Sequence, residues 1–164
     1  MRISKIVLVL MSVFVTGAAV AQSGNCTQID DSSRPDCPGA LAFFKHLQEA
    51  VKKDDRQAVA SMIEYPLLTT LEHKKMRIRN RQQLLSHFNQ IFDAGVRCAV
   101  LNATEKDVGG NWQGFTIDGG VVWFDGIIPS TEKPDTKASD FWTKYPFKII
   151  TVNNGDPNPC DKSR

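Results

Sequence analysis

The chain has no apolar run long enough to cross a membrane. Its longest, residues 6–15, is broken only by Ser12 and ends well short of the roughly 20 apolar residues that a spanning helix needs. Arg2 and Lys5 precede this run, and the small residues of Ala19-Val20-Ala21 follow it. This order is typical of a cleavable secretory signal peptide. We therefore expect cleavage after Ala21 and a mature protein that is periplasmic or secreted and has no membrane anchor.

Net charge is also missing from the mature chain. Removing 21 of the 164 residues leaves 143, enough for one domain with a substantial core. The full sequence has 20 Lys and Arg against 18 Asp and Glu, and the signal peptide takes Arg2 and Lys5 with it, so the remaining charges balance. A balanced chain lacks the positive field that gives proteins most of their nonspecific affinity for nucleic acid. We expect no nucleic-acid partner.

Closely spaced cysteines are absent as well. The chain contains Cys26, Cys37, Cys98 and Cys160, all in the mature part. An even number of cysteines in an exported chain indicates disulfides. Four cysteines permit three pairings, and the sequence does not choose among them. We favour Cys26 with Cys37, which closes a short N-terminal loop, and Cys98 with Cys160, which holds the tail.

Metal ligands do not cluster in the sequence. Zinc sites usually contain close pairs such as Cys-x-x-Cys, whereas the nearest cysteines here are 11 positions apart. The three histidines, His46, His73 and His87, are scattered. We expect no metal and no cofactor, and we interpret His46 and His87 as exposed or boundary residues.

The first half of the mature chain predicts helices. Residues 22–40 are polar and rich in Pro and Gly, and we expect an irregular leader there. Apolar residues then recur at three- and four-residue steps from Leu41, which predicts a helix to about residue 53. Asp54 or Asp55 is suited to cap a second, short helix. That helix should end at Tyr65, because Pro66 disfavours helical geometry in the residue before it.

A segment of alternating apolar and polar residues and a further helix follow in the sequence. Residues 67–80 alternate mostly with period two, which predicts strands with a hairpin or bend near residues 73–74. Asn80 is a good cap for a third helix over residues 81–93, and Gly95 is placed to end it.

The second half predicts strands over residues 96–103, 114–117, 121–127 and 148–153. Asp118-Gly119-Gly120 between two of them is a hairpin signal, because its residues tolerate positive φ. Residues 129–141 read as a polar loop and residues 155–164 as a tail that contains Cys160. Early helices followed by antiparallel strands favour a single α+β domain over residues 41–154.

Four segments carry a resemblance to a known family. They are residues 59–67, the helix that ends at Ile91-Phe92, residues 114–124 and residues 148–153. Together they resemble the nuclear-transport-factor-two-like, ketosteroid-isomerase-like superfamily, and within it small exported bacterial proteins of unknown role. The resemblance covers roughly residues 41–154 and contains no catalytic motif.

This resemblance implies a cone: a strongly curved, mostly antiparallel sheet around three helices, with a pocket at the wide end. Relatives such as ketosteroid isomerase and scytalone dehydratase perform acid–base chemistry in this pocket, whereas others bind a ligand or a partner. Relatives commonly dimerise through the outer face of the sheet, so a homodimer is a further expectation.

Acid–base residues are few. An isomerase-like site needs a desolvated carboxylate and a donor that stabilises an oxyanion. Asp125 shares a strand face with Trp123, and Tyr65 lies at the expected corner between helix and strand. Asp125 followed by Gly126 is more typical of a turn, and Tyr followed by Pro is more typical of a packing element. Neither is a strong catalytic candidate.

Aromatic residues gather in the second half of the chain. Small-molecule pockets are lined by such side chains with a few polar groups, although a core needs them too. The ligand-binding candidates are Tyr65, Phe92, Trp112, Trp123 and Trp142.

A basic stripe lies on one predicted strand. Lys75, Arg77 and Arg79 project from one face, with Lys74 and Arg81 at the ends. This pattern is usually a solvated edge strand whose charges discourage pairing with other chains. It could also meet an anionic envelope polymer or an acidic protein.

Three hypotheses for function remain. The first, which we favour because no acid–base pair converges, is a non-catalytic envelope protein that binds a small apolar ligand or a protein partner in the open end of the cone. The second is an isomerase or dehydratase that uses Asp125 or Tyr65. The third is an envelope interaction or immunity protein with the basic stripe or the loop around Trp142 as its contact surface.

Overall fold

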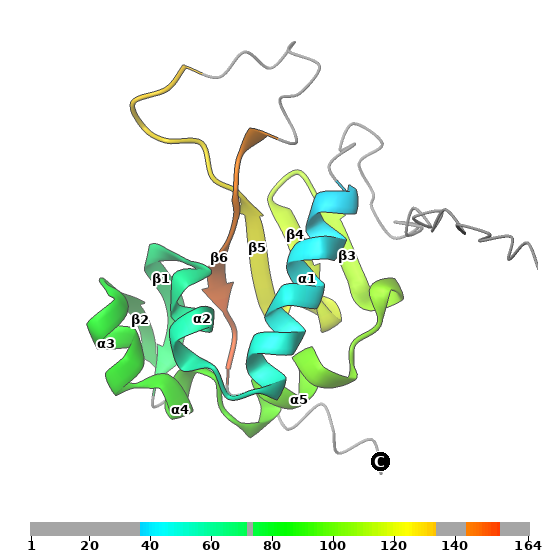
Figure 1. The fold of residues 1–164 in the computed structure, drawn as a ribbon. Coiled ribbons are helices and arrows are strands. Elements are labelled where there is room, and N and C mark those ends of the chain that lie inside the picture. Colours follow the sequence, from blue (N-terminus) through cyan, green and yellow to red (C-terminus); the bar gives the residue numbers. More distant parts are fainter. Residues whose placement is uncertain (1–36, 72–73, 134–143, 155–164) are drawn as a thin grey trace, which may run out of the picture.

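The computed structural model describes residues 37–71, 74–133 and 144–154 (Figure 1). These residues form five α-helices and a six-stranded sheet, which confirms the α+β class. The helices are α1 (Cys37–Lys52), α2 (Arg56–Ser61), α3 (Arg81–Ser86), α4 (Phe88–Ile91) and α5 (Ala94–Asn102). The strands are β1 (Ile63–Leu71), β2 (Lys74–Ile78), β3 (Val108–Asn111), β4 (Gly114–Ile117), β5 (Val122–Gly126) and β6 (Phe147–Val152).

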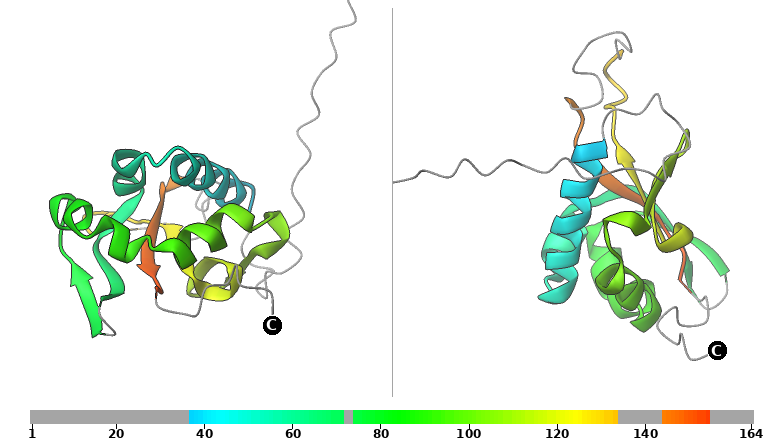
Figure 2. Two further views of the ribbon diagram at one scale, coloured as in Figure 1. Left: turned by 90° about the horizontal axis from the view of Figure 1, so that it is seen from below. Right: turned by 90° about the vertical axis from the view of Figure 1, so that its right-hand side faces the viewer.

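The sheet is mixed, with strand order β2-β1-β6-β5-β4-β3. β1 pairs with β6 in parallel, and the other neighbours pair antiparallel. The helices lie against one face of the sheet, and no described helix covers the opposite face (Figures 1 and 2). We call these the inner and the outer face. The sheet is not strongly curled, so the cone with its three helices is not what the described residues show.

The first helix begins earlier than the sequence suggested. α1 starts at Cys37, inside the segment that we expected to be an irregular leader, and continues to Lys52. Pro38 does not prevent this, because proline lacks only an N–H that is unpaired anyway in the first helical turn. Cys37 and Ala40 extend the buried stripe of Leu41, Phe44 and Leu47 by one turn, so burial determines where the helix begins.

The second helix is capped as expected but ends sooner. The Asp55 side chain accepts a hydrogen bond from Ala58 N at 2.9 Å, which confirms Asp55 rather than Asp54 as the cap. α2 ends at Ser61 and not at Tyr65. Pairing with β6 explains the difference, because Ile149 N donates to Met62 O at 2.7 Å and Ile63 lies opposite Ile149. Strand pairing therefore begins before Tyr65.

The alternating segment forms a hairpin, as predicted. Leu67 of β1 lies opposite Ile78 of β2, and the pairing runs to Leu71 opposite Lys74. The bend at residues 72–73, including His73, lies outside the described residues. β2 is an edge strand.

The third predicted helix is broken, and the strand predicted after it is wrong. Asn80 caps α3, its side chain accepting from Gln83 N at 2.9 Å, but the helix is interrupted at His87. Asp93 then caps α5 by accepting from Val96 N at 2.8 Å. Gly95 therefore lies inside a helix, and residues 96–103 are helical almost throughout. The buried residues Ala99 and Val100 lie three and four positions after the buried Val96, which is the spacing of a helix. The apparent period of two in this segment concealed that spacing.

The late strands lie close to their predicted positions. β4 matches its prediction, and β5 and β6 differ from theirs by a residue at their ends. β3 was missed, because Gly109-Gly110 is a poor strand signal. The turn between β4 and β5 has positive φ at Asp118 (48°), Gly119 (68°) and Gly120 (113°), as the hairpin signal requires.

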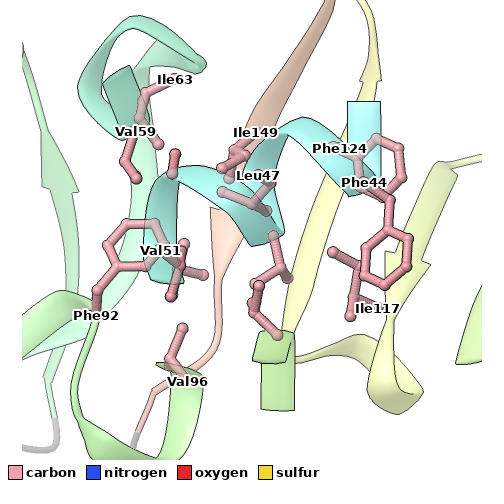
Figure 3. Packing of buried hydrophobic residues seen from close by; sticks show 14 of the residues in the cluster. Phe44, Leu47, Val51, Val59, Ile63, Phe92, Val96, Ile117, Phe124 and Ile149 are labelled. Atoms are coloured by element: carbon pink, nitrogen blue, oxygen red, sulfur yellow. The ribbon is translucent and has the colours of Figure 1, made fainter. Parts of the chain in front are cut away.

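The space between the helices and the inner face is filled by side chains (Figure 3). Phe44 and Phe124 are fully buried, and the Phe124 ring lies 4.9 Å from Phe43 and 5.7 Å from Phe115 between centroids. Such packing contributes about 0.5–1.5 kcal/mol per aromatic pair beyond simple burial. The inner face is therefore a packed core in the described residues.

Candidate functional site

The predicted ligand-binding residues do not line one cavity. Phe92 is 1% exposed and belongs to the core, whereas Trp112 is 80% exposed on the turn between β3 and β4. Trp123 is half-buried on β5, with Val122 and Phe124 on either side of it fully buried against the helices, so Trp123 faces outward. Trp142 lies outside the described residues. These aromatic residues are thus divided between the core, a turn and the outer face.

Tyr65 and Asp125 do not form an acid–base pair. The Tyr65 hydroxyl donates to Ala60 O of α2 at 3.2 Å, on the helix side of the sheet, and burial raises the pKa of this phenol. Asp125 alternates with the inward Phe124, and its Oδ1 accepts from Gly126 N at 2.8 Å. The two groups therefore lie on opposite sides of the sheet, and a single substrate does not reach both.

The two histidines that the structure describes, His46 and His87, also lack catalytic surroundings. His46 is exposed on α1, and Nδ1 of His87 lies 2.8 Å from Gln90 Oε1. Among the residues that the structure describes, no group of His, Cys, Asp or Glu could hold a metal ion. None of the described helices is long and apolar enough to span a membrane. Cys37 and Cys98 are both disulfide-bonded; their expected partners, Cys26 and Cys160, lie outside the described residues.

A hollow of about 310 Å³ lies at Trp123. Gln113, Ile150 and Thr151 complete its lining. Thr151 lies opposite Trp123 in the register between β5 and β6, and Ile150 is the extra residue where that register shifts. A bulge of this kind bends its strand and redirects side chains. The hollow thus lies at a local irregularity of β6.

One polar side chain beside Trp123 has an unpaired oxygen atom. Thr116 lies opposite Trp123 on β4, and its Oγ1 is the one buried side-chain polar atom without a hydrogen-bond partner in the described chain. A Cβ placed on Gly120 would lie 3.2 Å from Trp123 Nε1 and 3.7 Å from Thr116 Oγ1. Gly120 therefore gives the indole the room to lie beside Thr116. A buried hydroxyl without a hydrogen bond lowers the stability of the fold by about 1–3 kcal/mol.

The exposed apolar surface continues from the hollow onto β1. Leu68 lies opposite Thr151 and is 42% exposed, whereas its neighbours Leu67 and Thr69 are buried on the inner face. Leu68, Thr151 and Trp123 thus form one row across three strands of the outer face. Sequence reasoning missed Leu68, Ile150, Thr151 and Gln113, because neither the bulge nor the β1–β6 pairing leaves a signal in the sequence.

A second polar cluster fastens helices together. Asp54, between α1 and α2, has φ of 50° and accepts hydrogen bonds from Arg97 and Arg56. The Arg97 hydrogen bond lowers the pKa of Asp54 below its ordinary value. Arg97 Nε also donates to Phe92 O at 3.1 Å, and both guanidinium groups lie over the Phe88 ring. The depression beside them does not admit a water molecule.

Comparison of the chain with protein-family models, with curated proteins and with solved structures finds no match.

Proposed function

We propose that this protein is a non-catalytic binding protein of the cell envelope and that it holds a small, largely apolar ligand on the outer face of its sheet. The observation that carries this proposal is the hollow beside Trp123, with Leu68 exposed in the same row. A volume of about 310 Å³ reaches the lower end of the range of small-molecule sites. The lining combines an aromatic ring, an aliphatic side chain and a few polar groups, as such sites do.

The packed inner face argues against the internal pocket that the cone would provide. We propose that the chain nevertheless belongs to the nuclear-transport-factor-two-like superfamily, with phenylalanine rings filling the interior. Its mixed sheet with helices on one face is compatible with that fold. Binding then takes place on the outer face.

Export is part of the proposal. The signal-peptide pattern over residues 1–21 supports it, and so do the disulfide bonds of Cys37 and Cys98, because disulfides persist mainly in oxidising compartments. The enzyme hypothesis has less support, because Tyr65 and Asp125 lie on opposite sides of the sheet.

Two leucines provide a matched test. Leu68 on the outer face and Leu101 on α5 are 42% and 43% exposed. Native mass spectrometry of the protein recovered from its own cells should show a bound small molecule in the wild type and in Leu101→Asp. Leu68→Asp should lose it, because a carboxylate would be placed in an apolar row. Leu68→Asn, which adds no charge, should lose it too, and circular dichroism should show that both variants are folded.

Three outcomes contradict the proposal. Retention of the small molecule by folded Leu68→Asp places the ligand elsewhere. A wild-type protein that carries no small molecule removes the ligand altogether. A homodimer or a bound envelope protein in place of a small molecule assigns the outer face to protein contact.

A further inference from the structure

The outer face continues from the hollow to a strand that carries positive charge. Arg77 of β2 lies opposite Leu68 of β1, Leu68 opposite Thr151 of β6, and Thr151 opposite Trp123 of β5. Paired residues in a sheet project on the same side, so these four side chains form one row. Lys75, two positions before Arg77, projects on the same side and lies opposite Thr70.

These cations are available to a ligand. Lys75 and Arg77 are exposed, and the residues opposite them, Thr70 and Leu68, carry no charge. In the described part of the chain, the ion pairs involve other cations. Arg81, which the sequence placed at the end of the basic stripe, is engaged by hydrogen bonds to Gln57. Lys75 and Arg77 are therefore the cations that β2 presents on the outer face.

The spacing suits an extended molecule. Three strand steps separate Arg77 from Trp123, and at about 4.8 Å per step they span about 14 Å. One end of this row is cationic, the middle is Leu68 and Thr151, and the far end is the hollow beside Trp123. A ligand that follows the row meets positive charge at one end and then a mainly apolar surface that includes the polar side chains of Thr151 and Gln113.

We propose that the ligand is a small anionic amphiphile, with an acidic head group at Arg77 and Lys75 and an aliphatic chain that crosses Leu68 and Thr151 to the hollow beside Trp123. This inference rests on the proposed function and names its ligand class. An arginine can bind a carboxylate through two parallel hydrogen bonds. The aliphatic chain supplies most of the affinity through buried apolar area, and the head group supplies selectivity.

The same charges would also discourage this edge strand from pairing with a second copy. Like charges on two β2 strands repel, which protects an exposed edge from aggregation. That role requires only charge anywhere on the edge, whereas the amphiphile requires charge on the outer face. Lys74 and Lys75 separate the two roles, because they are adjacent on β2 and project from opposite faces.

Calorimetric titration with decanoate and with decanol tests the head group. These probes share an aliphatic chain and differ in charge. Wild-type protein should bind decanoate about tenfold more tightly than decanol, the factor that corresponds to about 1.4 kcal/mol. Arg77→Gln and Lys75→Gln should remove most of this preference and leave decanol binding unchanged. Lys74→Gln should change neither, and added salt should weaken decanoate binding alone.

The outcomes separate this inference from the function on which it rests. Equal binding of the two probes, with both lost in Leu68→Asp, overturns the anionic head group and keeps the outer-face site. Binding of both probes that Leu68→Asp does not affect overturns the site as well. Failure of the wild type to bind decanoate overturns the inference, and so does binding to phosphatidylglycerol vesicles without binding of free decanoate, which would assign the row to a membrane surface.

Discussion

The two faces of the sheet differ in what covers them. On β5, Phe124 is fully buried among Phe43, Phe115 and Phe147, whereas the adjacent Trp123 borders a hollow on the face without helices. The inner face is completed by the chain's own helices, and the outer face is left with half-buried apolar groups. The inner face therefore maintains the fold, and the outer face is where we propose that the ligand binds.

Replacing Phe124 and Trp123 by alanine should give the largest difference in stability between the two faces. Phe124→Ala should lower the free energy of unfolding by about 3–5 kcal/mol, because it leaves a cavity in a packed core. Trp123→Ala should cost less than half of that, because part of its ring already faces solvent. Urea denaturation followed by circular dichroism measures both. Equal losses would mean that the outer face is as tightly packed as the core.

Two threonines sharpen the comparison on a smaller scale. Thr69 is buried on the inner face, and its Oγ1 donates to Asn154 Oδ1 at 3.2 Å, whereas Thr116 Oγ1 has no partner. Thr69→Val should lower the free energy of unfolding by about 1 kcal/mol, because it leaves Asn154 with one bond fewer. Thr116→Val should be neutral or stabilising in the same denaturation assay. A loss of stability in Thr116→Val would indicate that this hydroxyl is hydrogen-bonded in solution.

The smallest predicted effect is a change in the pH dependence of stability, and it arises on the helical side of the sheet. The folded state lowers the pKa of Asp54 through Arg97, so the charged carboxylate stabilises the fold above the unfolded pKa of about 4. This stabilisation is lost as the pH falls through the lower folded pKa. Asp54→Asn, which tolerates the positive φ, should therefore flatten the fall in melting temperature on acidification.

Arg97→Gln should flatten the same profile, because it removes the main cause of the shift. If the melting temperature of Asp54→Asn depends on pH as that of the wild type does, the interaction between Asp54 and Arg97 does not contribute to stability. Decanoate binding should not change in either variant, because both residues lie on the helical side.

Local signals in the sequence predicted the parts of the fold that local interactions determine. Asp55 and Asn80 cap their helices through their own side chains, and Asp118-Gly119-Gly120 turns the chain as its backbone preferences require. The α5 helix was mistaken for a strand, because its cap at Asp93 was taken for the end of the preceding helix.

The candidate site was less predictable, because it depends on pairing between distant segments. Trp123 was identified as a ligand candidate, but nothing local shows that Leu68 and Thr151 lie in the same row. Parallel pairing of β1 with β6 brings residues together that are more than eighty positions apart. The bulge at Ile150, which lines the hollow, is likewise a property of the assembled sheet.

Amide and indole chemical shifts on addition of decanoate test most directly where a ligand binds. The largest changes should occur at Leu68, Thr151 and the Trp123 indole N–H, with smaller ones at Arg77. Residues around Phe44 and Phe92, on the inner side, should not change. Changes confined to the inner side would show that a ligand enters the core, and the outer-face account would then be wrong.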